Sequence, residues 1–161
     1  MNFKLWLEEK QGKKILLLIH PEIIYEVGLE QAQTYNKELI KHAANFDYII
    51  THHLGPTENW TDDRDLPDEM KQAYKLIFNT AKQISHSPMY KHDDYYGCSY
   101  EKELPDFLIE NPNSTIFFGG GYKRNCVQIA YNQLFNRLDW LLKDTNTKIE
   151  MYEPLLIDPS Y

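Results

Sequence analysis

The chain has 161 residues and carries 17 Lys and Arg against 24 Asp and Glu, which gives a net charge of −7. This length corresponds to one domain, and we expect residues 1–161 to form it. The hydrophobic share of 42% and the charged share of 25% are those of an ordinary globular protein, which excludes disorder, collagen and coiled coil as the main state. The acidic balance argues against a general nucleic-acid binder, because such proteins usually present a basic face.

The sequence also lacks the marks of a membrane-embedded or disulfide-stapled protein. Its apolar runs are far shorter than the roughly 18 residues of a membrane-spanning helix, and the run Ile15–Ile19 predicts a strand rather than a signal peptide. Cys98 and Cys126 are the only cysteines, which is too few for a disulfide framework. We therefore expect a cytoplasmic protein with no membrane partner.

Strand-like and helix-like patterns alternate along the first half of the chain. The apolar run Lys14–His20 predicts a strand that is buried on both faces. Apolar residues at near-helical spacing predict an amphipathic helix over Gly28–Asn45, and Asp47–His53 predicts a second strand. Pro67 fits the first position of a helix that continues to Ala81.

The second half continues the alternation after one irregular segment. Ser85–Ser99 shows no clear periodicity, and a segment of this length is either a functional loop or contains a short strand. Glu101–Glu110 predicts a short helix that Pro105 breaks at its first turn. The remaining predicted elements are a buried strand, a long helix and two terminal strand candidates: Ser114–Phe118, Asn125–Lys143, Lys148–Tyr152 and Leu155–Ile157.

This order of elements predicts the fold class. Alternating strands and helices favour an α/β protein, here a three-layer, Rossmann-like sandwich around a mostly parallel sheet with right-handed crossovers. Functional sites in such sheets lie beyond the carboxyl ends of the strands. Three polar or glycine-rich segments follow predicted strands there: His20–Glu22, His52–His53 and Gly119–Cys126.

The segment around Cys126 has the most specific chemistry in the sequence. A buried strand runs into Gly119–Gly121, and a helix begins about five residues later. Glycines permit positive φ angles and close backbone approach, and a helix start offers unsatisfied N–H groups and a positive dipole end. Lys123 and Arg124 add local positive charge. Together these features favour a thiolate nucleophile at Cys126, with an oxyanion-stabilising backbone beside it.

Two other interpretations of the same segment remain open. Cys126 also fits a small buried residue that packs the helix on the sheet, because free cysteines are often buried and inert. Alternatively, three glycines followed by Lys and Arg at a helix start form a site for a phosphate group. The segment matches neither G-x-G-x-x-G nor the P-loop spacing.

The segment Gly120–Val127 (GGYKRNCV) resembles the glycine-containing loop that ends in Cys-Val at a helix start in the isochorismatase-like cysteine hydrolases. This family includes nicotinamidases, N-carbamoylsarcosine amidohydrolases and isochorismatases. The resemblance implies an isochorismatase-like fold in which Cys126 attacks a carbonyl carbon. We expect the loop to contact the substrate through Gly120, Gly121, Tyr122 and Asn125.

Other positions depart from the family pattern. The run ILLLIHPE resembles the first-strand motif, but His20 stands where the family has its acidic base, and Glu22 stands at the position of a Gln. Lys91, ahead of the predicted helix around Leu104–Leu108, is the best candidate for the family lysine. A histidine can still act as a base toward a thiol, so the catalytic residues implied are Cys126, His20 and Lys91.

The resemblance implies a hydrolase that acts on an amide-type C–N bond of a small molecule through a cysteine nucleophile. The alternative is a catalytically altered protein of the same fold that binds a ligand, a nucleotide or a protein partner without turnover. The histidine at position 20 favours this alternative. Family members are commonly oligomeric, so the resemblance also implies a homo-oligomer.

Two further residues are candidates for substrate contact. His52 and His53 are adjacent on a strand end and point to opposite faces, so at most one faces the site, and we assign His53. Trp60 is a candidate for lining a pocket that holds a flat substrate. Alternatively, these two histidines bind a metal together with Asp62 or Asp63, or they only cap the strand end or face solvent. The family's D-x-H spacing is absent, and we expect no metal and no cofactor.

Overall fold

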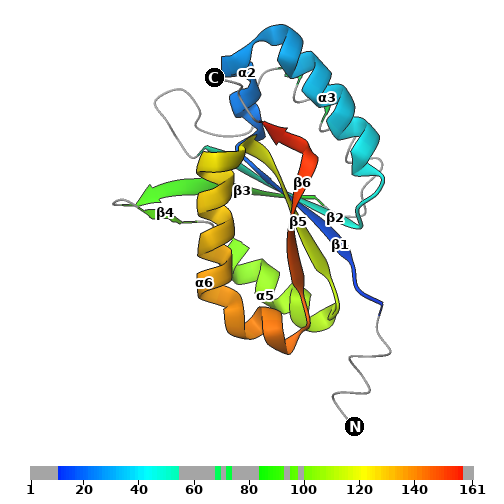
Figure 1. The fold of residues 1–161 in the computed structure, drawn as a ribbon, viewed down its shortest axis with the longest axis vertical. Helices are drawn as coiled ribbons and strands as arrows, with labels where there is room; N and C mark the ends of the chain where they lie inside the picture. Colours follow the sequence, from blue (N-terminus) through cyan, green and yellow to red (C-terminus); the bar gives the residue numbers. More distant parts are fainter. Residues whose placement is uncertain are drawn as a thin grey trace.

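The computed structural model of the chain describes residues 11–54, 68–69, 72–73, 84–92, 95–97 and 100–157. These residues form a six-stranded sheet with strand order β4-β3-β2-β1-β5-β6 (Figure 1). The strands are β1 (Lys14–Ile19), β2 (Tyr48–Leu54), β3 (Ile84–His92), β4 (Tyr95–Gly97), β5 (Thr115–Tyr122) and β6 (Lys148–Ile157). The helical elements are η1 (Pro21–Ile23), α2 (Ile24–Val27), α3 (Leu29–Ala43), α5 (Tyr100–Glu110), η3 (Lys123–Val127) and α6 (Gln128–Asp144).

The sheet is mostly parallel, as the alternation of strands and helices predicts. Every pair of neighbouring strands is parallel except β3 and β4. From β1 the chain adds β2 and β3 on one side, and it then returns to the other side of β1 to form β5 and β6. The direction of strand addition therefore reverses between β1 and β5. A reversal of this kind leaves a crevice at the carboxyl ends of the two strands, where open α/β sheets bind their ligands.

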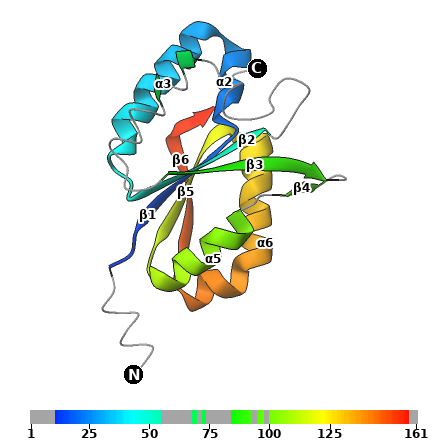
Figure 2. The same cartoon turned by 180° about the vertical axis from the view of Figure 1, so that it is seen from behind.

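Strand β1 is central because both of its faces are apolar. Every residue of Ile15–Ile19 has 0% of its surface exposed. Ile15, Leu17 and Ile19 pack in a cluster with α5 and α6, whereas Leu16 and Leu18 pack in a second cluster with α2 and α3. Figures 1 and 2 show these two pairs of helices on opposite sides of the sheet. Burying each such side chain contributes about 1.5–3 kcal/mol, so the two faces fix the register of the strand.

The segment Ser85–Ser99, which lacks periodicity, contains two strands. Strand β3 pairs in parallel with β2, and β4 then folds back on β3, with Lys91 opposite Tyr96. Of the two alternatives for this segment, a functional loop or a short strand, the strand is confirmed. Strand β3 is longer than expected, with nine residues. Few residues of β3 are apolar, so pairing with the edge of β2 determines its conformation and the sequence pattern does not reveal it.

Helix α5 shows that the predicted break at Pro105 is wrong. The helix runs from Tyr100 to Glu110 with Pro105 inside it. Proline lacks the N–H that would bond to the carbonyl group four residues earlier, and because this residue, Glu101, is inside the helix, one intrahelical hydrogen bond is lost. Leu104 and Leu108 on either side are 1% and 0% exposed. Their burial offsets the single lost hydrogen bond.

The bounds of two strands differ from those predicted. Strand β5 continues beyond Phe118 through the glycines to Tyr122, and the two terminal strand candidates form one strand, β6, with register shifts opposite the glycines. Residues 68–69 and 72–73 are helical, and the rest of the helix predicted from Pro67 to Ala81 lies outside the described residues.

None of the helices in the described part of the chain has the length and apolar character that a membrane crossing requires.

Candidate active site

The glycines of β5 bring its backbone directly against the end of β1. Gly120 has a φ angle of +92°, and a Cβ atom at this position would overlap the carbonyl oxygen of Ile19 and lie 2.6 Å from its amide nitrogen. Only glycine fits both the φ angle and the space. The glycine run therefore serves first to pack two backbones together, which is a different role from holding a phosphate group.

Gly121 provides the space that the thiol of Cys126 occupies. A Cβ atom on Gly121 would lie 2.5 Å from Sγ of Cys126 and 2.9 Å from the carbonyl oxygen of Ile19. Cys126 belongs to η3, a π-helical turn that continues into α6, and its reduced thiol is half-buried. Sγ donates a hydrogen bond to the carbonyl oxygen of Tyr122 at 3.8 Å. The thiol thus folds back over the end of β5, beside the end of β1.

His20 ends β1 in a conformation that non-glycine residues rarely adopt. Its φ angle is +47°, and only 2% of its surface is exposed. The left-handed conformation costs on the order of 1–3 kcal/mol in a non-glycine residue. The carbonyl oxygen of His20 accepts a hydrogen bond from the amide of Ile23 at 3.1 Å, which starts η1. Strained backbone and buried titratable groups concentrate at functional sites.

His20 and Cys126 approach each other at Gly121. A Cβ atom on Gly121 would lie 2.5 Å from Sγ of Cys126 and 3.5 Å from Cβ of His20. Sγ of Cys126 is therefore no farther from Cβ of His20 than the sum of these two distances. Two of the three predicted catalytic residues thus lie close together where β1 and β5 end.

Part of the positive charge expected near Cys126 is neutralised by an ion pair. Nζ of Lys123 lies 2.6 Å from Oε1 of Glu153 on β6, while Arg124 is exposed to solvent. Because Lys123 pairs with a carboxylate, it supports a thiolate or a bound phosphate less than its position in the sequence suggests. Among the helix-start residues, Asn125 is also exposed and Tyr122 is half-buried.

The other predicted site residues are placed by their backbones. Ile19 lies opposite His52, and His53 follows at the carboxyl end of β2. Lys91 lies four residues beyond Ser87 on β3, in the part of that strand that pairs with β4. It is separated from β1 by β2, so its role as an electrostatic partner of the thiol stays a prediction. Trp60 lies outside the described residues.

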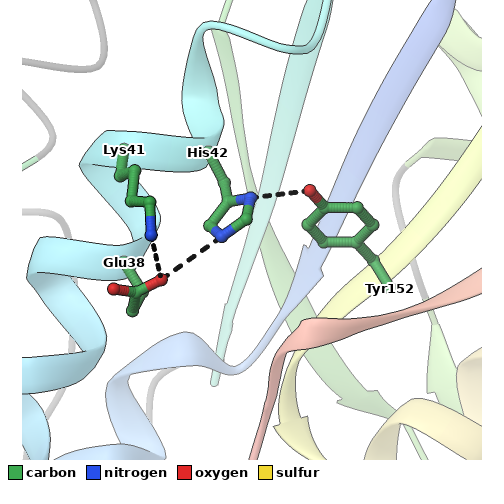
Figure 3. Close-up of polar contacts among 4 residues, drawn as sticks. All are labelled: Glu38, Lys41, His42 and Tyr152. Atoms are coloured by element: carbon green, nitrogen blue, oxygen red, sulfur yellow. Dashed lines mark hydrogen bonds and ion pairs between the residues drawn. The ribbon is translucent and has the colours of Figure 1, made fainter.

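A second cluster of polar side chains, which no pattern in the sequence predicts, joins α3 to β6. Nδ1 of His42 lies 2.7 Å from the hydroxyl oxygen of Tyr152, and Nε2 lies 3.3 Å from Oε2 of Glu38 (Figure 3). A carboxylate can only accept, so Nε2 carries a proton, and in the neutral imidazole Nδ1 accepts from the phenol. Rings of Phe46 and Phe117 contact the Tyr152 ring edge-on. The i,i+4 spacing of Glu38 and His42 was visible in the sequence, but Tyr152 is 110 residues away.

A third polar contact links α2 and α3 through Tyr25 and Asn36. Nδ2 of Asn36 donates to the hydroxyl group of Tyr25 at 2.9 Å. Burial raises the pKa of Tyr25, the hydrogen bond from Asn36 opposes this rise, and the charge of Glu69 adds to it. Asn36 is 6% exposed, and its Oδ1 atom has no hydrogen-bond partner among the residues that the structure describes. An amide oxygen of this kind is usually satisfied by a buried water molecule.

A metal centre finds no support in the part of the chain that the structure describes. No group of three or more His, Cys, Asp or Glu side chains there has an arrangement suited to a metal ion. Asp62 and Asp63, which the alternative metal site required, lie outside the described residues.

Comparisons with protein-family models, with curated proteins and with solved structures gave no match to this chain.

Proposed function

We propose that the protein is a hydrolase in which Cys126 attacks the carbonyl carbon of a small amide-type substrate, with His20 as the base. The observation that carries the proposal is the approach of the Cys126 thiol and the buried His20 side chain at Gly121. The order of the elements adds support, because the chain resembles the isochorismatase-like cysteine hydrolases in having its cysteine at the helix start that follows the strand beside β1.

In the proposed reaction, His20 accepts the thiol proton while Sγ of Cys126 forms a bond to the carbonyl carbon. The carbonyl π electrons move to oxygen and give a tetrahedral oxyanion. Its collapse re-forms the carbonyl, breaks the C–N bond and expels the amine, which takes the proton from the His20 imidazolium. Water then attacks the thioester and gives a proton to His20. As the C–S bond breaks and the acid leaves, His20 returns this proton to Sγ of Cys126, which restores the thiol and the neutral base.

The backbone around Cys126 supplies the stabilisation that the oxyanion needs. The helical segment of η3 and α6 starts at Lys123, and the first four N–H groups of a helix lack intrahelical acceptors. Backbone donors of this kind lower the barrier of acyl transfer because they are already oriented toward the developing charge.

Alkylation with iodoacetamide at pH 7, followed by mass spectrometry of the peptides, tests the proposal. An activated thiol is about half ionised at this pH and an ordinary thiol only a few per cent, so Cys126 should react about tenfold faster than free cysteine. The peptide masses separate Cys126 from Cys98. His20→Asn should return the rate to that of free cysteine, because Asn tolerates a positive φ angle but supplies no base.

His42→Asn is the matched control, since His42 is also largely buried but belongs to the second polar cluster. This variant should leave the rate of Cys126 unchanged. A rate equal to that of free cysteine in the unmodified protein, or an equal effect of the two histidine variants, contradicts the proposed nucleophile.

Binding without turnover is the second candidate function, and a specific contact favours it. The hydrogen bond from Sγ to the Tyr122 carbonyl oxygen holds the thiol in its protonated form, which is the less nucleophilic one. In this case small amides should protect Cys126 from alkylation, but incubation with them should release no amine.

A further inference from the structure

Strand β6 does not follow β5 evenly at the edge of the candidate active site. Met151 pairs with Phe118, whereas Leu156 pairs with Gly120. Two steps along β5 therefore correspond to five along β6, and the extra residues of β6 form a bulge opposite the glycines. Such bulges re-aim side chains and are common next to active sites. Glu153 belongs to this bulge and is exposed.

The carboxylate of Glu153 reaches the first residue of η3. Its Oε1 atom lies 2.6 Å from Nζ of Lys123, which precedes Cys126 by three residues in the same helical turn. The side chains of Lys123 and Glu153 are 34% and 65% exposed. An ion pair with this much exposure contributes little to folding stability, so its main effect is on the electrostatic potential around the proposed nucleophile.

The pair cancels an attraction that Lys123 would otherwise exert on negative charge. A lone ammonium group near a thiol favours the thiolate, and it also attracts anionic reactants. The carboxylate of Glu153 removes most of this field, because the two opposite charges lie only 2.6 Å apart. The hydrogen bond from Sγ of Cys126 to the carbonyl oxygen of Tyr122 is that of a protonated thiol, as expected where the thiolate gains little from a nearby cation.

Other charged and titratable groups near the thiol come from several elements. His20 at the end of β1 is the proposed base, and Arg124 on η3 is exposed. The cysteine also packs against the cluster under α6, as do Tyr48 of β2 and Tyr131 of α6, and phenols are uncharged at neutral pH. Glu153 is the carboxylate that an ion pair ties to this turn.

We propose that Glu153 is a specificity-determining residue of the site at Cys126. By pairing with Lys123, it disfavours the thiolate and lowers the attraction of the site for anionic substrates, so that the site favours uncharged amides. The role of Glu153 rests on the proposed function and narrows its substrate class from amides in general to uncharged ones.

Two alkylating reagents of similar shape and different charge test this role in the full chain. At pH 6 and an ionic strength of about 0.15 M, Glu153→Gln should raise the alkylation rate of Cys126 about threefold with neutral iodoacetamide and about tenfold with anionic iodoacetate. Lys123→Gln should lower both rates by similar factors, and the double variant should return to the wild-type rates. The pH of half-maximal alkylation should fall by about 0.5 unit in Glu153→Gln, which a purely structural role would not cause.

Glu150→Gln is the matched control, because it removes the same charge from an exposed position on the same strand. Both of its rates should equal those of the wild type, and circular dichroism should show every variant folded. Wild-type rates in Glu153→Gln, an equal rise with the two reagents, or an equal effect of Glu150→Gln overturns the role of Glu153.

The proposed nucleophile is judged separately, by the wild-type rate with iodoacetamide at pH 7. If this rate equals that of free cysteine, the nucleophile is wrong, whatever Glu153→Gln does to the ratio of the two reagents. If the wild-type rate is enhanced and Glu153→Gln changes neither rate, the nucleophile stands and Glu153 has no part in its selectivity.

Discussion

His20 and His42 both join distant parts of the chain, but by different means. At His20, the backbone carries the strain: its φ angle is +47°, and the neighbouring strand reaches it only because Gly120 and Gly121 lack side chains. At His42, the backbone is ordinary helix, and the imidazole forms a hydrogen bond with the phenol of Tyr152 and lies 3.3 Å from the carboxylate of Glu38 (Figure 3).

The difference supports the proposal that His20, and not His42, acts in the reaction. The hydrogen bond between the unstrained His42 and Tyr152 stabilises the fold at little cost, because it ties α3 to β6. A left-handed, buried His20 costs free energy and is retained only where the surrounding structure and some use of the residue hold it. We therefore expect perturbation of the Gly120–His20 region to abolish function and perturbation of the His42 cluster to lower stability alone.

The largest effect should come from Gly120→Ala. The added Cβ overlaps the backbone of Ile19, which cannot move as a side chain can, and φ is +92° at this position. We expect a loss of about 3 kcal/mol in the free energy of unfolding, from overpacking together with the unfavourable φ angle. Urea denaturation measures the loss, and alkylation of Cys126 should lose its enhancement in the same variant.

Gly119→Ala is the matched control in the same run of glycines. Its added Cβ would lie 3.2 Å from Cδ2 of Leu18 and from Cβ of Leu155, and 3.3 Å from the carbonyl oxygen of Leu155. These contacts are longer than those of a Cβ on Gly120, and shifts of a few tenths of an ångström relieve them. The loss should be about 1 kcal/mol or less. Equal losses for the two variants would show that the approach of β5 to β1 does not determine the site.

Tyr152→Phe should have a smaller effect and should act on stability alone. The variant keeps the edge-on ring contacts and removes the hydroxyl group that bonds to His42, so the free energy of unfolding should fall by about 1 kcal/mol. Tyr131→Phe is the control, because Tyr131 packs on Phe118 and its hydroxyl group has no hydrogen bond among the described residues. If Tyr152→Phe slows alkylation of Cys126, the two histidine regions are coupled and the contrast fails.

Much of the fold follows from local pattern. The continuous apolar run of β1, the amphipathic α3 and the strand–glycine–helix segment are all visible in the sequence, because burial on one or two faces imposes a period on the residues. Strand β3 is different: residues such as Ser85, His86 and Ser87 carry no strand period, and only pairing with β2 makes them a strand. The extension of β5 through its glycines likewise depends on contact with β1.

The candidate site, like the fold, is predictable where it depends on local pattern. The sequence placed Cys126 at a helix start and His20 at a strand end, and the sheet topology brings them together. The pairing of Lys123 with Glu153 and the contact between His42 and Tyr152 link residues 30 and 110 positions apart. Such contacts are set by packing of the whole sheet, so no local pattern reveals them.

The smallest effect concerns Tyr25 on α2, which lies in neither histidine region. We expect Tyr25 to make the free energy of unfolding depend on pH. Burial and the charge of Glu69 raise its pKa above 10.0 in the folded chain. The folded state therefore keeps the phenol proton where the unfolded state releases it. The stability linked to this proton is fully present below pH 10.0 and is lost as pH rises through the folded pKa. Denaturant unfolding of wild type and Tyr25→Phe from pH 8 to 11 should show their difference shrinking above about pH 10. Glu69→Gln should move that decline to lower pH, and a difference independent of pH would mean that Tyr25 ionises alike in both states.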